Sequence, residues 1–111
     1  MDTLNAYRTA IIQVLTEWKE FLQSGPELNM DLVVDRDRDR YLLVEIGWEK
    51  GYRIYAPLIH IDIIEGKLWI QHDGTEHGVA PELAAAGVPK DAIILGFRSE
   101  PARALSQFAT V

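Results

Sequence analysis

Hydrophobic residues at the start of the chain recur every three or four positions. This spacing places them on one face of an α-helix, and the members of that face are Leu4, Tyr7, Ile11, Leu15, Trp18 and Leu22. Asp2 or Thr3 can serve as the N-cap, and Gly25-Pro26 ends the run. The pattern therefore predicts an amphipathic helix whose apolar side must be covered by a sheet or by another chain.

After this helix the spacing changes to the alternation of β-strands. Two strands are predicted at Met30–Val34 and Tyr41–Trp48, joined through Asp35–Arg40. In the second strand the apolar even positions are expected to face the core, and these are Leu42, Val44 and Ile46.

A loop of Glu49-Lys50-Gly51 is predicted to connect this strand to the next. Gly51 can adopt the positive φ that such loops require. With this loop, the expected pairs are Trp48 with Tyr52, Ile46 with Ile54, and Val44 with Ala56.

A second hairpin is predicted around a two-residue turn at Glu65-Gly66. One face then pairs aliphatic residues, with Ile61 opposite Ile70, Ile63 opposite Leu68, and Ile59 opposite His72. The other face pairs His60 with Gln71 and Asp62 with Trp69. A slip of one residue would mix the two sets, so the pattern itself supports this register.

The alternation changes phase between the two hairpins. Expected core positions are even as far as Ala56 and odd from Ile59 onward. Pro57 lies at the change, and proline within a sheet is confined mainly to edges and bulges. We therefore predict a bulge or sharp bend between Ala56 and Ile59.

The last third of the chain mixes helix and strand signals. Asp73-Gly74-Thr75 ends the strand, and a helix is predicted from about Glu76–Gly78 to Ala86, with Gly87 as its left-handed cap and Pro89 preventing continuation. Ile93–Phe97 is predicted as a short buried strand, and Ser99-Glu100-Pro101 as the start of a last short helix or turn carrying Leu105 and Phe108. These elements make one α+β domain over residues 1–111.

Composition narrows the classes of function. A net charge of −6 argues against direct binding to nucleic acid and against docking on an anionic membrane. The chain has no cysteine, which excludes disulfides, thiolate catalysis and cysteine-ligated zinc. Neither a secretory signal nor an apolar run of bilayer length is present, so a cytoplasmic protein is expected. No cofactor is expected.

The densest group of polar residues is the run from His72 to His77. A metal site could use His72, Asp73 and His77, with Glu76 as a base. The other interpretation is a strand end and a turn followed by a capped helix, with Thr75 as the cap and the two carboxylates favouring the helix N-terminus. Because no established metal-ligand spacing is present, we favour the structural interpretation and predict no metal.

A second candidate is the polar face of the predicted hairpin, which carries His60, Asp62, Trp69 and Gln71. An aspartate beside a histidine can tune it as an acid or base, but a tryptophan among polar neighbours is typical of interfaces. We favour an interface over catalysis, and no residue is assigned a catalytic role.

Two weaker patterns have simpler explanations. Asp62 with Glu65-Gly66-Lys67 is superficially similar to a metal-dependent nuclease pattern, but Glu65 and Gly66 form the predicted turn. Asp35–Arg40 alternates acid and base, and its arginines could contact phosphates. Because the interleaved carboxylates repel phosphate, we interpret the segment as a solvated loop whose neighbouring charges cancel.

The stretch GKLWIQHDGTEHGVAPELAAAGVPKDAIILGF resembles the signature region of the XisI family, the excision controlling factors of the cyanobacterial fdxN element. The similarity extends to YLLVEIGW at Tyr41–Trp48, to Arg53, to His60–Ile63, to Tyr7-Arg8 and to Arg103–Ala109, and so covers nearly the whole chain. Leu68 and Ser106 are mild departures, where the family usually has isoleucine and threonine.

This resemblance implies a small accessory protein of programmed DNA-element excision in heterocyst-forming cyanobacteria. Its companion would be a nuclease-like XisH protein, to which any cutting chemistry would belong. The first hypothesis is therefore a non-enzymatic partner of a XisH-type protein. The alternatives are a metal-dependent hydrolase using His72–His77 and a weak DNA-binding regulator. A homodimer is also expected, since the apolar helix face and the Trp69 face offer more apolar surface than so small a core covers.

Overall fold

The computed structural model describes residues 2–23 and 27–110. Its elements follow in the order α1 (Thr3–Leu22), β1 (Leu28–Asp35), β2 (Arg40–Glu49), β3 (Tyr52–Ile64), β4 (Lys67–Asp73), α2 (Ala80–Ala85), the 3-10 turn η1 (Lys90–Ala92), β5 (Ile93–Ile94) and α3 (Glu100–Ala104). The strands form one five-stranded sheet in the order β1-β2-β3-β4-β5. Neighbours are antiparallel except for β5, which runs parallel to β4. The predicted α+β class is confirmed.

The first helix forms where the sequence pattern places it. Oδ1 of Asp2 accepts hydrogen bonds from the backbone N–H groups of Leu4 and Asn5, which would otherwise lack partners at the helix start. The helix buries Ala10, Ile11, Val14 and Leu15. The predicted helix end at Gly25-Pro26 lies outside the described residues.

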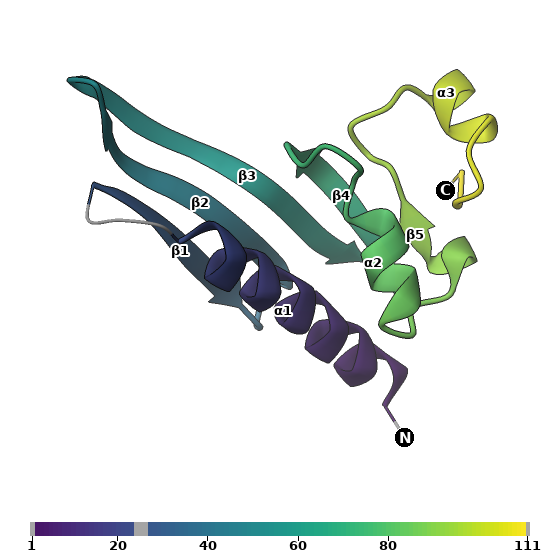
Figure 1. The fold of residues 1–111 in the computed structure, drawn as a ribbon. Coiled ribbons are helices and arrows are strands. Elements are labelled where there is room, and N and C mark those ends of the chain that lie inside the picture. The colour runs from purple at the N-terminus through teal and green to yellow at the C-terminus, as the bar shows by residue number, and fades with distance from the viewer. Residues whose placement is uncertain (1, 24–26, 111) are drawn as a thin grey trace.

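One face of the sheet carries the core. Figure 1 shows α1 and α2 side by side on this face, while the β2–β3 turn projects beyond them. The sheet contributes the aliphatic ladder Ile59, Ile61, Ile63, Leu68 and Ile70, and the helices contribute Ile11, Leu15, Ala80 and Leu83. We call this the inner face and the opposite side the outer face.

On β2 the structure overturns the predicted inner face. Tyr41 and Leu43 belong to the core cluster, whereas Leu42 and Ile46 are half-buried on the outer face. Val44 is buried too, but it lies outside the core cluster. The prediction was wrong because Tyr41–Val44 is apolar on both faces, so alternation alone does not distinguish inside from outside.

The β2–β3 turn also differs from the prediction. Glu49 pairs with Tyr52, so the loop is Lys50-Gly51 and every predicted pair of this hairpin is displaced by one residue. Both loop residues have positive φ, 51° at Lys50 and 82° at Gly51. Such a primed turn matches the right-handed twist of the flanking strands, which outweighs the cost of a positive φ at lysine.

The predicted irregularity near Pro57 is confirmed. Leu43 pairs with Ile59 but Val44 pairs with Pro57, which leaves Leu58 as the extra residue of a bulge. This bulge allows one strand to present even residues inward at Ile54 and odd residues inward at Ile59.

The turn at Glu65-Gly66 is confirmed, together with the pairs nearest to it. A second bulge, which the sequence pattern did not indicate, then shifts the register at Gln71. His60 therefore pairs with His72 instead of Gln71, and Ile59 pairs with Asp73 instead of His72.

Helix α2 begins later than predicted, at Ala80, and Gly87 follows it with a φ of 108° in the region that glycine tolerates. The predicted strand Ile93–Phe97 is shorter, with only Ile93 and Ile94 paired to β4. Helix α3 follows Ser99, whose hydroxyl caps it by accepting from the N–H of Ala102. Within residues 2–23 and 27–110, no helix is long and apolar enough to span a membrane.

Candidate functional site

The structure brings together three of the predicted polar residues on the outer face. Asp62 is only 6% exposed, and its Oδ1 lies 2.7 Å from Nε2 of His60. Its Oδ2 accepts a hydrogen bond of 3.3 Å from Nε2 of Gln71. The confirmed Glu65-Gly66 turn sets this arrangement, because it places Asp62 on the face opposite the aliphatic ladder.

A fourth member of this cluster, Arg40, was missed. Its Nε lies 3.5 Å from Oδ1 of Asp62, and the two residues are directly paired across β2 and β3. Arg40 directly precedes the predicted strand Tyr41–Trp48, so its position beside the sheet was visible in the sequence. Its pairing with Asp62 was not, because the register predicted for the β2–β3 hairpin was displaced by one residue. A buried carboxylate is tolerated here because donors surround it.

Trp69, the fourth residue of the predicted polar face, is half-buried against the C-terminal segment. The guanidinium of Arg103 lies over its ring, with 5.7 Å from Cζ to the ring centroid. Gly96 also approaches so closely that a Cβ there would come within 3.0 Å of Cε3 of Trp69. Arg103 is itself buried, and its Nε and Nη1 find partners by donating to the carbonyl oxygens of Thr110 and Arg98. The C-terminal segment therefore covers Trp69.

The His72–His77 segment forms a structured turn. Oδ1 of Asp73 accepts from both the N–H and the hydroxyl of Thr75, and Oδ2 accepts from the N–H of Val79 at 2.7 Å. The predicted helix cap at Thr75 is therefore wrong. The side chain of Asp73 accepts from the backbone N–H of Val79 just before α2, and Thr75 only donates to Asp73 within the turn. Glu76 and His77 are exposed.

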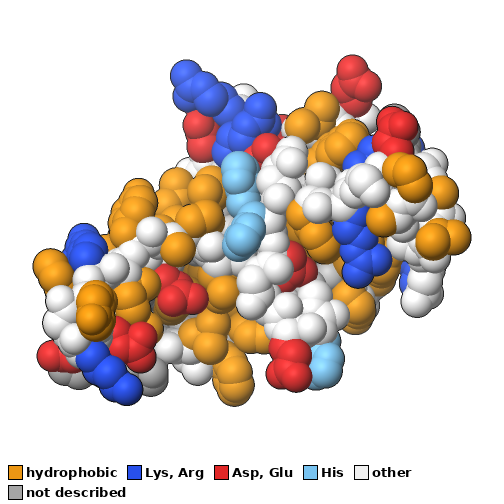
Figure 2. Space-filling view, turned by 90° about the horizontal axis from the view of Figure 1, so that it is seen from above, with side chains coloured by type: hydrophobic (Ala, Val, Ile, Leu, Met, Phe, Trp, Pro, Cys, Tyr) orange, Lys and Arg blue, Asp and Glu red, His pale blue; other side chains and the backbone are white. Residues whose placement is uncertain are grey.

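The same segment does not assemble a metal site. No group of three or more histidine, aspartate or glutamate side chains in the described parts of the chain is placed to hold a metal ion. His72 lies across from His60 on neighbouring strands, and Figure 2 shows two histidine side chains together in the middle of the view. Both carboxylate oxygens of Asp73 already accept hydrogen bonds within the turn. The side chains of His72–His77 are therefore not arranged as the metal ligands that the hydrolase hypothesis requires.

The Asp35–Arg40 loop is less self-contained than predicted. Oδ2 of Asp35 forms an ion pair with Arg38, as expected for neighbouring charges. Asp39, in contrast, has its partners outside the loop, on α1 and β2. Its Oδ1 and Oδ2 accept from Nε and Nη2 of Arg8 at 2.8 and 3.1 Å, and its Oδ1 also accepts from the Tyr41 hydroxyl at 2.8 Å. This bidentate contact ties α1 to the sheet.

The contact has consequences for ionisation. The hydrogen bond from Arg8 holds the pKa of Asp39 below its usual value, and the bond from Tyr41 acts in the same direction. Burial raises the pKa of Tyr41 to about 12, and the neighbouring Asp39 carboxylate adds to that rise.

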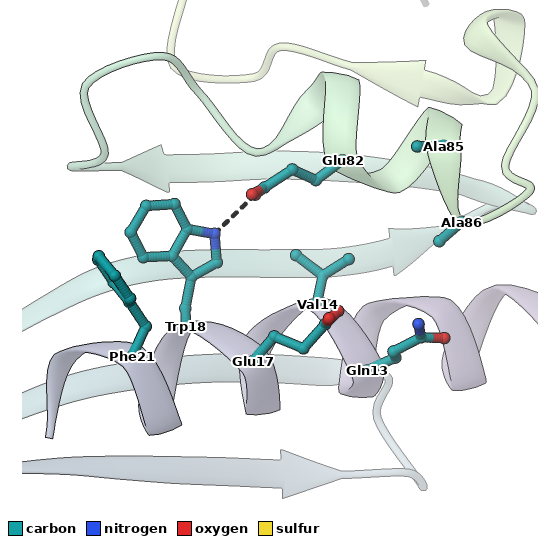
Figure 3. Close-up of a pocket in the computed structure, with 8 residues that line it drawn as sticks. All are labelled: Gln13, Val14, Glu17, Trp18, Phe21, Glu82, Ala85 and Ala86. Atoms are coloured by element: carbon teal, nitrogen blue, oxygen red, sulfur yellow. Dashed lines mark hydrogen bonds between the residues drawn. The ribbon is translucent and has the colours of Figure 1, made fainter.

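A groove lies between α1 and α2. This groove, of about 510 Å³, is lined by Gln13, Val14, Glu17, Trp18, Phe21, Glu82, Ala85 and Ala86. The indole N–H of Trp18 donates to Oε2 of Glu82 at 2.6 Å across the groove, as Figure 3 shows. Phe21 meets Trp18 edge-on at 5.9 Å between ring centroids, yet it remains 78% exposed. The groove thus presents an aromatic pair with carboxylates beside it.

The groove was not predicted from the sequence. Trp18 was assigned to the covered helix face, and Phe21 belonged to no predicted feature. The signal was Phe21 itself, a large apolar residue beside the predicted face. Glu82, the hydrogen-bond partner of Trp18, comes from α2, far along the chain.

The fold is an α+β domain with an open five-stranded sheet. A sequence model described as XisI protein matches residues 1–110. The chain therefore belongs to the XisI family, as its resemblance predicted.

Solved structures agree with this assignment. A crystal structure of a XisI-like protein from Anabaena variabilis shares 28% identity with the chain, covers 99% of it and 100% of its own chain, and superposes with a TM-score of 0.87. A second structure, of the fdxN element excision controlling factor XisI from Anabaena variabilis, has 32% identity, the same coverage and a TM-score of 0.86. No curated protein matches the chain.

Proposed function

We propose that this chain is a non-enzymatic controlling factor of DNA-element excision that acts in the cytoplasm by binding a XisH-type partner. The observation that carries this proposal is the α1–α2 groove, where Phe21 stays 78% exposed beside Trp18. Exposed aromatic residues beside a concave apolar surface are typical anchor sites for a protein partner. The controlling role is supported by membership of the XisI family.

The groove is prepared for binding before a partner arrives. Glu82 accepts the indole hydrogen bond and so restricts the orientation of Trp18, and Val14 and Ala86 are apolar residues of the lining. A preorganised aromatic side chain loses little conformational entropy on association. Glu17 lies among the lining residues, so basic groups of the partner would find a carboxylate at the rim.

The polar cluster supports a role in recognition over one in catalysis. Asp62 is buried, and its oxygens already meet His60, Gln71 and Arg40. A carboxylate held in this way stabilises the sheet and has little freedom to act as a base. In this proposal the cutting chemistry belongs to the XisH-type partner.

The direct test is co-expression of the chain with a tagged XisH-type protein, followed by pull-down over a range of salt concentrations. The wild-type chain should be retained, and Phe21→Ala should weaken the association by at least about 30-fold, the loss expected for an anchor residue. Phe97→Ala is the matched control, since Phe97 is also an exposed phenylalanine but lies outside the groove. Failure of the wild-type chain to associate at any salt concentration would contradict the proposal.

A charge reversal tests the groove separately from its aromatic pair. Glu17→Arg changes the rim and leaves the Trp18–Glu82 hydrogen bond in place. It should slow association with the partner and reduce the salt dependence of binding. Glu49→Arg, an exposed reversal at the β2–β3 turn, should have no effect. Equal effects of the two reversals would place the partner elsewhere.

A further inference from the structure

A second apolar surface lies on the outer face of the sheet, opposite both α1 and α2. Its members project from the outer side of β1, β2 and β3, and they are Val33, Leu42, Val44, Ile46, Trp48, Tyr55 and Pro57. We call this set the outer stripe. Figure 2 shows hydrophobic side chains extending from the histidines toward the end of the molecule that carries the β2–β3 turn.

The register of the sheet establishes that these residues share a face. Leu42, Val44 and Ile46 alternate with Tyr41 and Leu43, which point into the core. Across the ladders, Val33 pairs with Leu42, Val44 with Pro57, and Ile46 with Tyr55. None of the seven belongs to the core cluster or packs against it. The bulge at Leu58 makes the alignment possible, because it shifts the phase of β3 at Pro57.

The C-terminal segment, which packs on the outer face at β4, leaves Trp48 and Tyr55 of the outer stripe exposed. The C-terminal segment covers Trp69 on β4 through Arg103 and Gly96. On β2 and β3, Trp48 is 53% exposed and Tyr55 is 70% exposed. The Arg53 guanidinium lies 5.3 Å from the ring centroid of Trp48. Tryptophan, tyrosine and arginine are the residue types that most often dominate binding at protein interfaces.

We infer that the outer stripe is the interface of a homodimer, in which two copies pack their sheets face to face. The area fits this occupant. Trp48 and Tyr55 together expose roughly 250 Å², taking about 200 Å² for each ring-bearing side chain. Val33, Pro57 and Arg53 are exposed as well and add to this area, whereas Val44 is buried and adds little. A biological interface buries at least about 1,000 Å² in total, and the rings of Trp48 and Tyr55 from each of two copies supply roughly half of that area.

The charges also fit a second copy of this chain. The whole chain carries −6, so most of its surface repels another copy. Of the charged residues that border the stripe, Asp35 is paired with Arg38 and Arg40 with Asp62. Asp31, opposite Val44 on β1, and Arg53, opposite Trp48 on β3, add one charge of each sign. A two-fold axis near the middle of the stripe would bring Asp31 of one copy toward Arg53 of the partner subunit. A face with balanced charge is where two acidic copies meet with least repulsion.

The inference is tested by the mass of the protein in solution. Sedimentation equilibrium of the wild-type chain at micromolar concentration should give twice the monomer mass of 12.6 kDa. Tyr55→Glu should weaken the dimer by at least about 30-fold and give the monomer mass. Tyr52→Glu is the matched control, because Tyr52 is 77% exposed on the same hairpin but faces the other side of the sheet. Far-UV circular dichroism should be identical for all three proteins.

Two results would overturn the inference. One is a wild-type chain that remains at the monomer mass up to about 100 μM. The other is a Tyr55→Glu variant that is folded and still dimeric, which would place the interface elsewhere. The outer stripe and the α1–α2 groove lie on opposite faces of the sheet, so Phe21→Ala should leave the dimer intact. Loss of partner binding and loss of dimerisation are therefore separable.

Discussion

Replacement of Asp62 by alanine should lower the free energy of unfolding by about 2–3 kcal/mol. The carboxylate is 6% exposed and lies 2.7 Å from Nε2 of His60, a charge-assisted contact of the kind that contributes roughly 1.5–3 kcal/mol. The contacts with Gln71 and Arg40 are longer, at 3.3 and 3.5 Å, and add less. The Arg40 side chain is also half-exposed, and ion pairs at the surface contribute about 0–1 kcal/mol. For a chain of 111 residues this corresponds to a melting point lower by about 8–12 °C.

The measurement is urea unfolding at a fixed protein concentration, followed by tryptophan fluorescence and by circular dichroism. Asp62→Asn keeps one acceptor oxygen without the charge and should lose about half as much stability as Asp62→Ala. Asp37→Ala removes an exposed carboxylate from the β1–β2 loop and should change stability by less than about 0.5 kcal/mol. The reasoning is refuted if Asp62→Ala is as stable as Asp37→Ala, since the cluster would then contribute nothing to the fold.

Three further predictions concern the contacts around β2. Tyr41→Phe removes the buried hydroxyl that donates to Asp39 and should cost about 1 kcal/mol in urea unfolding. Because the pKa of Tyr41 is raised from 10.0 to about 12, wild-type stability should fall from pH 10 to 12, and Tyr41→Phe should flatten that fall. Because the bond from Arg8 lowers the pKa of Asp39, its stabilising contribution is present above about pH 4 and lost at lower pH, so Asp39→Asn should reduce the acid sensitivity of thermal unfolding. Gly47→Ala should prevent soluble expression or greatly lower the melting point, since its methyl group would overlap the carbonyl oxygen of Glu27.

Much of the candidate site was predictable from local sequence. His60 and Asp62 are two residues apart in one strand, so alternation alone puts them on one face. The turn at Glu65-Gly66 then brings in Gln71, which reaches Asp62 even though the second bulge displaces its backbone pairing. The placement of Arg40 and the covering of Trp69 by Arg103 were not predictable, because each depends on a register or on a chain segment remote in the sequence.

The sequence by itself determined the elements whose signals are local. The apolar periodicity and the Asp2 cap define α1, the aliphatic alternation from Ile59 defines the inner side of β3, and Pro57 marks the bulge. Such features need only the backbone geometry of a few neighbouring residues. Family membership was also evident from the chain between residues 66 and 97, where the resemblance is most specific.

Only the tertiary structure decided which side of β2 is inside. Tyr41, Leu42, Leu43 and Val44 are all apolar, so either face could have met the helices. The turn at Lys50-Gly51 and the bulge at Leu58 set the register, and α1 then packs on the side of Tyr41 and Leu43. The physical reason is that one small domain has only enough helix to cover one face of its sheet. The other face is left with the outer stripe, and its apolar surface is the basis of the homodimer that we infer.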